Sequence, residues 1–202
     1  MKNLKLAVLL FFFGQLTLKA QEIVGGFKLS PNYSLVKDDN PSKDFTNKEY
    51  PVVGTVGIGL GYFETMKLND KYDLQAEVNY TMHSFNRKIS SKSSEDNNFW
   101  TYSYVDLPFI VKRKFGSLSA GLGLMYRKGL SGKDKNEKID SNTKTITEKD
   151  SDPSSEFNFL FDLSYKVKKV HFGFRLFRGN KNLLETGNPA NYAAFNIGFD
   201  VF

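Results

Sequence analysis

The most regular stretch of the chain runs from Tyr72 to Met82, where apolar and polar residues alternate without a break. Apolar side chains occupy the even-numbered positions, and polar side chains occupy the odd-numbered ones. Neighbouring side chains on a β-strand point to opposite faces, so this pattern predicts a strand with one apolar and one polar face. At about 9–11 residues, such a strand is long enough to cross a bilayer at a tilt.

The same alternation recurs along the rest of the chain and predicts seven further strands. Together the expected strands cover 23–36, 52–66, 72–85, 100–115, 117–126, 156–167, 170–177 and 192–202. Short turns near 68–71, 115–117 and 167–169 alternate with long polar stretches at 37–50, 86–99, 128–155 and 178–191. This order is typical of outer-membrane barrels, which have short periplasmic turns, long extracellular loops and both termini inside. We therefore predict an all-β fold, an eight-stranded antiparallel up-and-down transmembrane β-barrel over residues 21–202.

A soluble, secreted lipocalin-like binding barrel is the structural alternative. The apolar row of each strand faces outward in a membrane barrel and inward in a lipocalin-like barrel. The polar face of this chain is rich in Gly, Ser and Asn with single charges, which suits the narrow interior of a membrane barrel. The predicted interior polar network comprises Asp73, Glu77, Asp106, Lys112, Arg127, Asp162, Lys166, Arg175 and Asp200. Because an isolated buried charge is costly, we expect these charges to pair and stiffen the barrel; a narrow conducting path is the alternative.

Aromatic residues and the polar loops give further expectations. Seven tyrosines near strand ends are expected at the interfacial girdles: Tyr62, Tyr72, Tyr80, Tyr102, Tyr126, Tyr165 and Tyr192. The aromatic segment 98–102 fits either the outer girdle or a contact with a protein, glycan or lipid head group. The charged stretch 133–152 is expected to be disordered. Pro108 lacks an N–H, so a bulge or a local break is expected there.

Residues 1–20 have the features of a secretory signal peptide. Lys2 and Lys5 precede the apolar stretch 6–13, and Ala20 is a small residue before the expected cleavage site. This leader predicts export to the periplasm followed by insertion into the bacterial outer membrane. Without it, 25 basic residues remain against 22 acidic ones, too small an excess to indicate nucleic-acid binding.

The segment from Val105 to Lys112, with the sequence VDLPFIVK, resembles a strand of the PorT-type outer-membrane β-barrel family, which is related to OmpA-like barrels. The glycine-rich segments 57–63 and 121–123 resemble glycine-rich strands of that family. The resemblance implies an outer-membrane barrel with a structural, adhesive or secretion-associated role. It also implies contact with outer-membrane lipids and lipopolysaccharide, and with the barrel-assembly machinery during insertion.

The C-terminal Phe202 resembles the terminal aromatic residue that this insertion machinery recognises, together with Phe199. The apolar row of the last strand is out of phase with Phe202 by one residue. A lipid-modifying acyl hydrolase is a further alternative, because His83 is next to Ser84 and Glu77 shares the face of His83. In a regular strand, however, His83 and Ser84 point to opposite faces. With two His and no Cys, neither a metal site nor a cofactor is expected.

Overall fold

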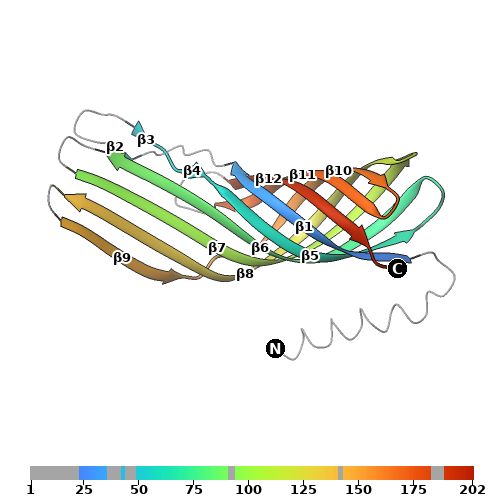
Figure 1. Ribbon diagram of the computed structural model, residues 1–202, viewed down its shortest axis with the longest axis horizontal. Coiled ribbons are helices and arrows are strands. Elements are labelled where there is room, and N and C mark those ends of the chain that lie inside the picture. The colour runs from blue at the N-terminus through green and yellow to red at the C-terminus, as the bar shows by residue number, and fades with distance from the viewer. Residues whose placement is uncertain (1–22, 36–41, 44–48, 91–93, 141–142, 183–188) are drawn as a thin grey trace, which may run out of the picture.

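The computed structural model describes residues 23–35, 42–43, 49–90, 94–140, 143–182 and 189–202. Eight antiparallel strands form a ring, each paired with its neighbours along the chain (Figure 1). In ring order they are β1 (Ile23–Leu35), β5 (Val56–Lys67), β6 (Tyr72–Ser90), β7 (Ser94–Phe115), β8 (Leu118–Asp140), β10 (Glu156–Val167), β11 (Val170–Asn182) and β12 (Pro189–Asp200). The pairing of β12 with β1 closes the ring, and the predicted up-and-down barrel is confirmed.

Four shorter strands add to this ring. β4 (Val53–Gly54) precedes β5 in the chain and pairs with β6 beyond the first residues of β5. β9 (Thr143–Ser151) pairs with β8. β2 (Ser42–Lys43) and β3 (Glu49–Tyr50) form a separate two-stranded sheet. Within the part of the chain that is described, no helix is long and apolar enough to span a membrane.

Three short turns lie at one end of the barrel, where β1 begins and β12 ends (Figure 1). The β7–β8 turn contains Gly116 at φ 68°, a left-handed conformation that glycine adopts without steric cost. In the β5–β6 turn, the Asn69 side chain accepts hydrogen bonds from the backbone N–H groups of Lys71 and Tyr72, both at 2.9 Å. These local contacts explain why two of the three pairs of strands can be joined so tightly.

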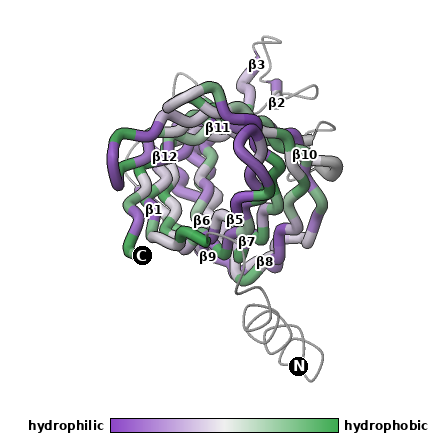
Figure 2. Tube along the Cα trace, turned by 90° about the vertical axis from the view of Figure 1, so that its right-hand side faces the viewer, coloured by the Kyte–Doolittle hydropathy of each residue, from purple (hydrophilic) through white to green (hydrophobic). Residues whose placement is uncertain are grey.

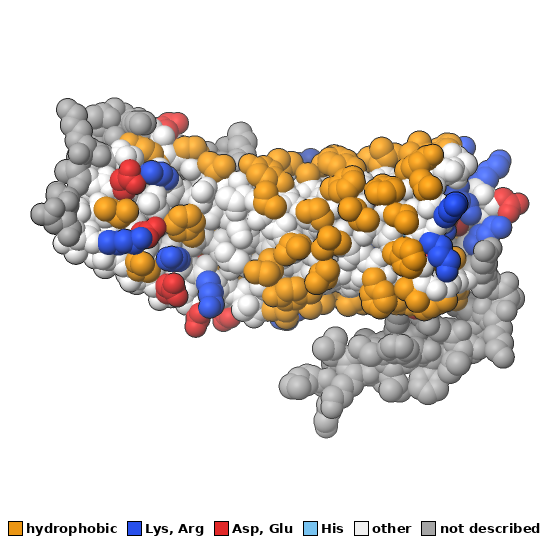
Figure 3. Space-filling model, in the orientation of Figure 1, with side chains coloured by type: hydrophobic (Ala, Val, Ile, Leu, Met, Phe, Trp, Pro, Cys, Tyr) orange, Lys and Arg blue, Asp and Glu red, His pale blue; other side chains and the backbone are white. Residues whose placement is uncertain are grey.

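The two faces of the barrel wall have opposite character. Leu122 and Phe159 point outward with 70% and 67% of their surface exposed, whereas Arg127 and Asp162 point inward with 1%. Hydrophobic side chains cover a broad band of the outer surface, and charges gather at its two ends (Figure 3). The end-on view shows the strands surrounding a central axis (Figure 2). The outward orientation of the apolar row, which separates a membrane barrel from a lipocalin-like one, is confirmed.

Strands extend into two stretches that the sequence analysis assigned to loops. β6 continues to Ser90 and β7 begins at Ser94, while β8 continues to Asp140 and returns as β9. The predicted disorder at 133–152 is therefore wrong for the described residues 133–140 and 143–152. The apolar alternation stops where a strand leaves the hydrophobic band, but backbone hydrogen bonding continues the ladder without it.

Of the two outcomes expected at Pro108, the structure shows a local break in the pairing with β6 and no bulge. Ala76 lies opposite Phe109 and Asn79 opposite Asp106, so the register of β6 against β7 is the same on both sides of Pro108. The register shift in this strand lies instead between Ser103 and Tyr104, in its pairing with β8. Pro108 is thus accommodated by a short gap in the ladder alone.

Two of the tyrosines predicted for the interfacial girdles are buried inside the barrel instead. Tyr102 and Tyr192 belong to an internal cluster with Val52, Phe85 and Tyr104. The prediction used their position near strand ends and ignored which face they occupy. Trp100, from the predicted girdle segment 98–102, also packs against this internal cluster.

The orientation of the wall leads to a stability prediction. Leu122 lies about halfway along the hydrophobic part of β8, so Leu122→Arg should lower the free energy of unfolding in bilayers by about 2–4 kcal/mol. Ile146, on β9, is 49% exposed, and the matched Ile146→Arg change should cost no more than about 0.5 kcal/mol. Urea unfolding in lipid vesicles measures both values, and equal costs would contradict the assigned orientation.

Candidate functional site

A buried ionic cluster fills the half of the barrel nearest the short turns. Arg175 donates to both carboxylate oxygens of Glu77 at 2.8 Å and, through Nε, to Asp162 at 2.8 Å. Lys28 forms an ion pair with Glu77, and Lys112 forms one with Asp162 at 2.8 Å. The five side chains come from five different strands, so the cluster ties opposite walls of the barrel together.

Pairing register and ring closure both contribute to this cluster. Asp162 lies directly opposite Arg175 in the β10–β11 ladder, so these two meet as cross-strand neighbours. Glu77 is 98 positions from Arg175 along the chain and reaches it across the interior. Outside this cluster, Asp106 and Arg127 also meet as cross-strand neighbours, in the β7–β8 ladder.

Arg127 is the centre of the other half of the interior. It donates to both oxygens of Asp106 at 2.7 and 2.8 Å. Its guanidinium lies between the rings of Tyr104 and Tyr192, at 4.7 and 4.6 Å from their centroids. Glu156 approaches the same group at 3.7 Å. Cation–π contacts on both faces and a bidentate carboxylate together fix this buried arginine.

Positive and negative charges balance within these two groups. The cations are Lys28, Lys112, Arg127 and Arg175, and the carboxylates are Glu77, Asp106, Asp162 and Glu156. Two cavities among these residues have volumes of only about 30 and 20 Å³. A space of that size holds about one water molecule, which leaves little room for a solute.

The remaining predicted network residues lie near the short-turn end. Lys166 pairs with Asp200 at 2.8 Å, and His171 contacts the other oxygen of Asp200 through Nε2. Asp73 pairs at 2.8 Å with Lys114, which the sequence analysis did not include. Of the nine predicted residues, four therefore share the ionic cluster: Glu77, Lys112, Asp162 and Arg175. Four more form the pairs Asp106–Arg127 and Lys166–Asp200, and Asp73 pairs with a residue outside the predicted set.

Three charges that belong to these groups are absent from the predicted network: Lys28, Lys114 and Glu156. Lys28 lies between Phe27 and Leu29, both of which point outward, so strand alternation alone would have placed it inside. Lys114 has the same phase as Lys112. Glu156 has the same phase as Asp162 on the predicted strand 156–167.

Glycines on β5 make room for polar side chains in this interior. A Cβ on Gly61 would overlap the side chain of Asn79, which hydrogen-bonds to Glu77 at 3.0 Å. A Cβ on Gly57 would overlap the backbone carbonyl of Met82. The glycine-rich pattern of this strand thus follows from close packing inside the barrel.

The proposed hydrolase residues do not come together. His83 points inward, whereas Ser84 points away from it and contacts the Thr101 hydroxyl at 3.3 Å. The hydroxyl nearest to His83 belongs to Ser34, with Oγ 3.4 Å from Nδ1. Ser34 has 0% exposure, so no substrate can reach this hydroxyl in the folded barrel. Among the described residues, no group of three His, Cys, Asp or Glu side chains is arranged to hold a metal ion.

Phe199 and Phe202 occupy different settings at the C-terminus. Phe199 points outward from β12, in the apolar row. Phe202 lies beyond the strand, beside Gly25, whose N–H donates to the Phe202 carbonyl at 3.3 Å. Both aromatic rings are exposed at the short-turn end.

The opposite end carries a sheet of β6, β7, β8 and β9 that extends past the other strands (Figure 1). One face has an amide ladder, in which Asn136 donates to Asp96 at 2.6 Å and to Asn98 at 2.7 Å. On the other face, Lys88 pairs with Glu95 at 3.0 Å. These cross-strand contacts give the sheet order without an apolar core.

The ionic cluster predicts a large stability effect. Glu77→Ala leaves Lys28 and Arg175 without their shared carboxylate, so the free energy of unfolding in vesicles should fall by about 3–5 kcal/mol. Glu95→Ala, which breaks the exposed pair with Lys88, is the matched control and should cost no more than about 1 kcal/mol. Similar urea midpoints for the two variants would show that the interior pairs do not stabilise the barrel.

Comparison with solved structures gives distant similarities to small barrels. Ail of Yersinia pestis in a bilayer nanodisc is 12% identical, with 87% of this chain and 99% of that chain covered and a TM-score of 0.40. Neisserial surface protein A is 11% identical, with coverages of 90% and 99% and a TM-score of 0.38. The N-terminal barrel domain of Pseudomonas aeruginosa OprF is 10% identical, with coverages of 87% and 96% and a TM-score of 0.36. These similarities are too distant to carry a functional argument.

Comparison with curated proteins gives no match. The family model described as "Outer membrane protein beta-barrel domain" matches residues 15–180, which is most of the chain. The family places the protein in the bacterial outer membrane, in agreement with the closed ring and its apolar outer surface. The chain belongs to the outer membrane protein β-barrel domain family.

Proposed function

We propose that this protein is a closed, non-enzymatic barrel that anchors the β6–β9 sheet in the outer membrane and displays it outside the cell as a structural or adhesive surface. The observation that carries the proposal is the ordered sheet above an interior filled by paired charges. The leader at 1–20, which lies outside the described residues, would direct export to the periplasm. A PorT-type, secretion-associated role is the more specific form of this proposal.

The filled interior supports an anchoring role over a transport role. Glu77, Arg175 and Asp162 cross the interior in the half nearest the short turns, and Arg127 with Asp106 blocks it again nearer the extended sheet. Opening a path would require breaking several buried ion pairs, each of which costs several kcal/mol when one partner is lost. A solute path along the axis is therefore unfavourable.

The extended sheet supports a role in contacts outside the membrane. β9 is exposed along Thr143 to Asp150 and pairs only with β8 among the described strands. The outer face of the extended sheet mixes Ile139 of β8 and Ile146 of β9 with charged side chains, a composition suited to a polar partner surface. The partner could be a protein reached through this end of the molecule.

Two other contacts follow from the same surface features. The apolar row, represented by Leu122 and Phe159, would face outer-membrane lipids and, in the outer leaflet, lipopolysaccharide. Phe199 and Phe202, exposed near the chain end, would serve as the signal for the barrel-assembly machinery. The small excess of basic over acidic residues in the chain does not support binding to nucleic acid.

The alternatives have less support. An acyl hydrolase needs a nucleophile that its substrate can reach, and Ser34 beside His83 is fully buried. A soluble lipocalin-like barrel needs its apolar row inside, and here that row points outward.

Labelling in intact cells tests the proposed placement. The chain has no Cys, so Glu148→Cys on β9 and Lys169→Cys in the β10–β11 turn each introduce a single thiol. A membrane-impermeant maleimide should label the Glu148→Cys protein in whole cells. It should label the Lys169→Cys protein only after the outer membrane is permeabilised. The reverse pattern, or recovery of the folded protein in the soluble periplasmic fraction, would refute the proposal.

Electrical recording tests the closed interior separately. In planar bilayers the wild-type barrel should show no stable conductance steps, because the buried ion pairs block the axis. The double variant Glu77→Ala/Arg175→Ala removes the ion pair that crosses the interior and should raise the frequency of conducting events. Steady single-channel currents from the wild-type protein would contradict a closed barrel.

A further inference from the structure

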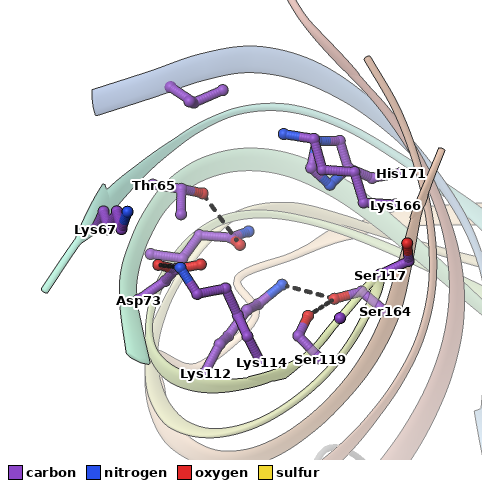
Figure 4. Close-up of a pocket in the computed structure, with 13 residues that line it drawn as sticks. Thr65, Lys67, Asp73, Lys112, Lys114, Ser117, Ser119, Ser164, Lys166 and His171 are labelled. Atoms are coloured by element: carbon purple, nitrogen blue, oxygen red, sulfur yellow. Dashed lines mark hydrogen bonds and ion pairs between the residues drawn. The ribbon is translucent and has the colours of Figure 1, made fainter. Parts of the chain in front are cut away.

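A cavity of about 190 Å³ opens at the periplasmic end of the barrel, and we call it the vestibule. Its walls come from the ends of strands on all sides of the ring, including β5, β7, β10 and β11. Lys112, Lys114 and Ser119 lie on one side of the open space, and Lys166 and His171 lie on the other (Figure 4). None of the functions considered above uses this cavity.

Lysines outnumber carboxylates in the lining of the vestibule. Four lysines line it, Lys67, Lys112, Lys114 and Lys166, whereas the only carboxylate among the lining residues is Asp73. The hydroxyls of Ser119 and Ser164 lie 2.8 Å apart on its wall and add uncharged donors. A cavity with this lining suits an anion that accepts several hydrogen bonds at once.

The lysines keep hydrogen-bonding capacity despite their carboxylate partners. Lys114 contacts Asp73 at 2.8 Å, and Lys166 contacts Asp200 at 2.8 Å. Lys67 contacts Asp70 at 3.1 Å. An ammonium group has three N–H donors, so one such contact leaves others available. Lys112 contacts both Asp162 and the Ser164 hydroxyl, at 2.8 and 3.1 Å, and forms the inner wall.

The buried cluster behind the vestibule shares Lys112 with its wall, and the other two cations of the cluster balance its two carboxylates, so the cluster does not cancel the charge of Lys112. The ionic cluster next to it contains three cations, Lys28, Lys112 and Arg175, against Glu77 and Asp162. The compensating negative excess lies in the other half of the barrel, where Asp106 and Glu156 face Arg127. Charges at the end of a low-dielectric cylinder act on an anion with little screening.

We propose that the vestibule binds a phosphate group presented from the periplasm. A phosphate carries one to two negative charges and has acceptor oxygens directed to different sides, which matches lysines placed around a cavity. A carboxylate is planar and carries a single charge, so it would leave more of the lysines uncompensated. The group could belong to free inorganic phosphate or to the head group of a phospholipid in the inner leaflet.

Calorimetric titration of the folded full-length barrel in a non-ionic maltoside micelle tests this site. Sodium phosphate should bind with saturation at one site, and sodium chloride at equal ionic strength should give no such signal. Lys166 is 45% exposed in its side chain, so Lys166→Gln should fold normally; heat-modifiable gel migration checks this. Loss of one charge-assisted contact should weaken phosphate binding by at least about tenfold.

The adjacent turn provides a matched control. Lys168→Gln removes the same charge at the same end, but Lys168 does not line the vestibule, so binding should stay within about twofold of wild type. Absence of saturable binding, or equal weakening by Lys166→Gln and Lys168→Gln, would overturn the proposal. Ser119→Ala, a small change on the cavity wall, is a second variant that should also weaken binding.

A final comparison separates the two sources of phosphate. A short-chain phosphatidylglycerol below its micellar concentration is titrated in place of sodium phosphate. Binding that competes with inorganic phosphate and is lost in Lys166→Gln would assign the site to a lipid head group. Binding of inorganic phosphate alone would assign it to the free anion. Binding of neither probe would refute the site.

Discussion

Charges inside a narrow barrel must compensate one another, because neither water nor lipid is available to do so. In this protein Arg175 connects Glu77 with Asp162, and Arg127 pairs with Asp106 while its guanidinium contacts two tyrosine rings. Removing one partner would leave a buried charge at a cost of several kcal/mol. The same requirement fixes the orientation of the wall, since every strand that turns a charge inward also turns its apolar row outward.

This arrangement gives the three regions of the molecule different properties. The middle is filled and electrically balanced, which suits an anchor. The extracellular end continues as a hydrogen-bonded sheet without an apolar core, and it offers the largest ordered surface outside the membrane. The periplasmic end combines an open cavity with an excess of lysines. Contacts with other molecules are therefore expected at the two ends and not along the axis.

The sequence predicted the barrel well wherever lipid contact enforces alternation. β10 was predicted over its full length from Glu156 to Val167, because its outward positions are apolar and its inward ones, apart from the buried Leu160, are polar. The extension of β8 past Tyr126 was missed, because outside the bilayer no apolar row marks a strand. The sequence also did not predict which charged residues pair with one another across the interior. The contact between Glu77 and Arg175 depends on ring closure and register, which no local pattern encodes.

The outward orientation of the apolar row is the claim on which the account depends most directly. A nitroxide placed in turn at each position from 157 to 163 of β10, in bilayer-embedded protein, reports contact with lipid through its accessibility to dissolved oxygen. The account predicts high accessibility at the odd-numbered positions and low accessibility at the even-numbered ones. High accessibility at the even-numbered positions, or access of a water-soluble relaxation agent to the odd-numbered ones, would contradict it.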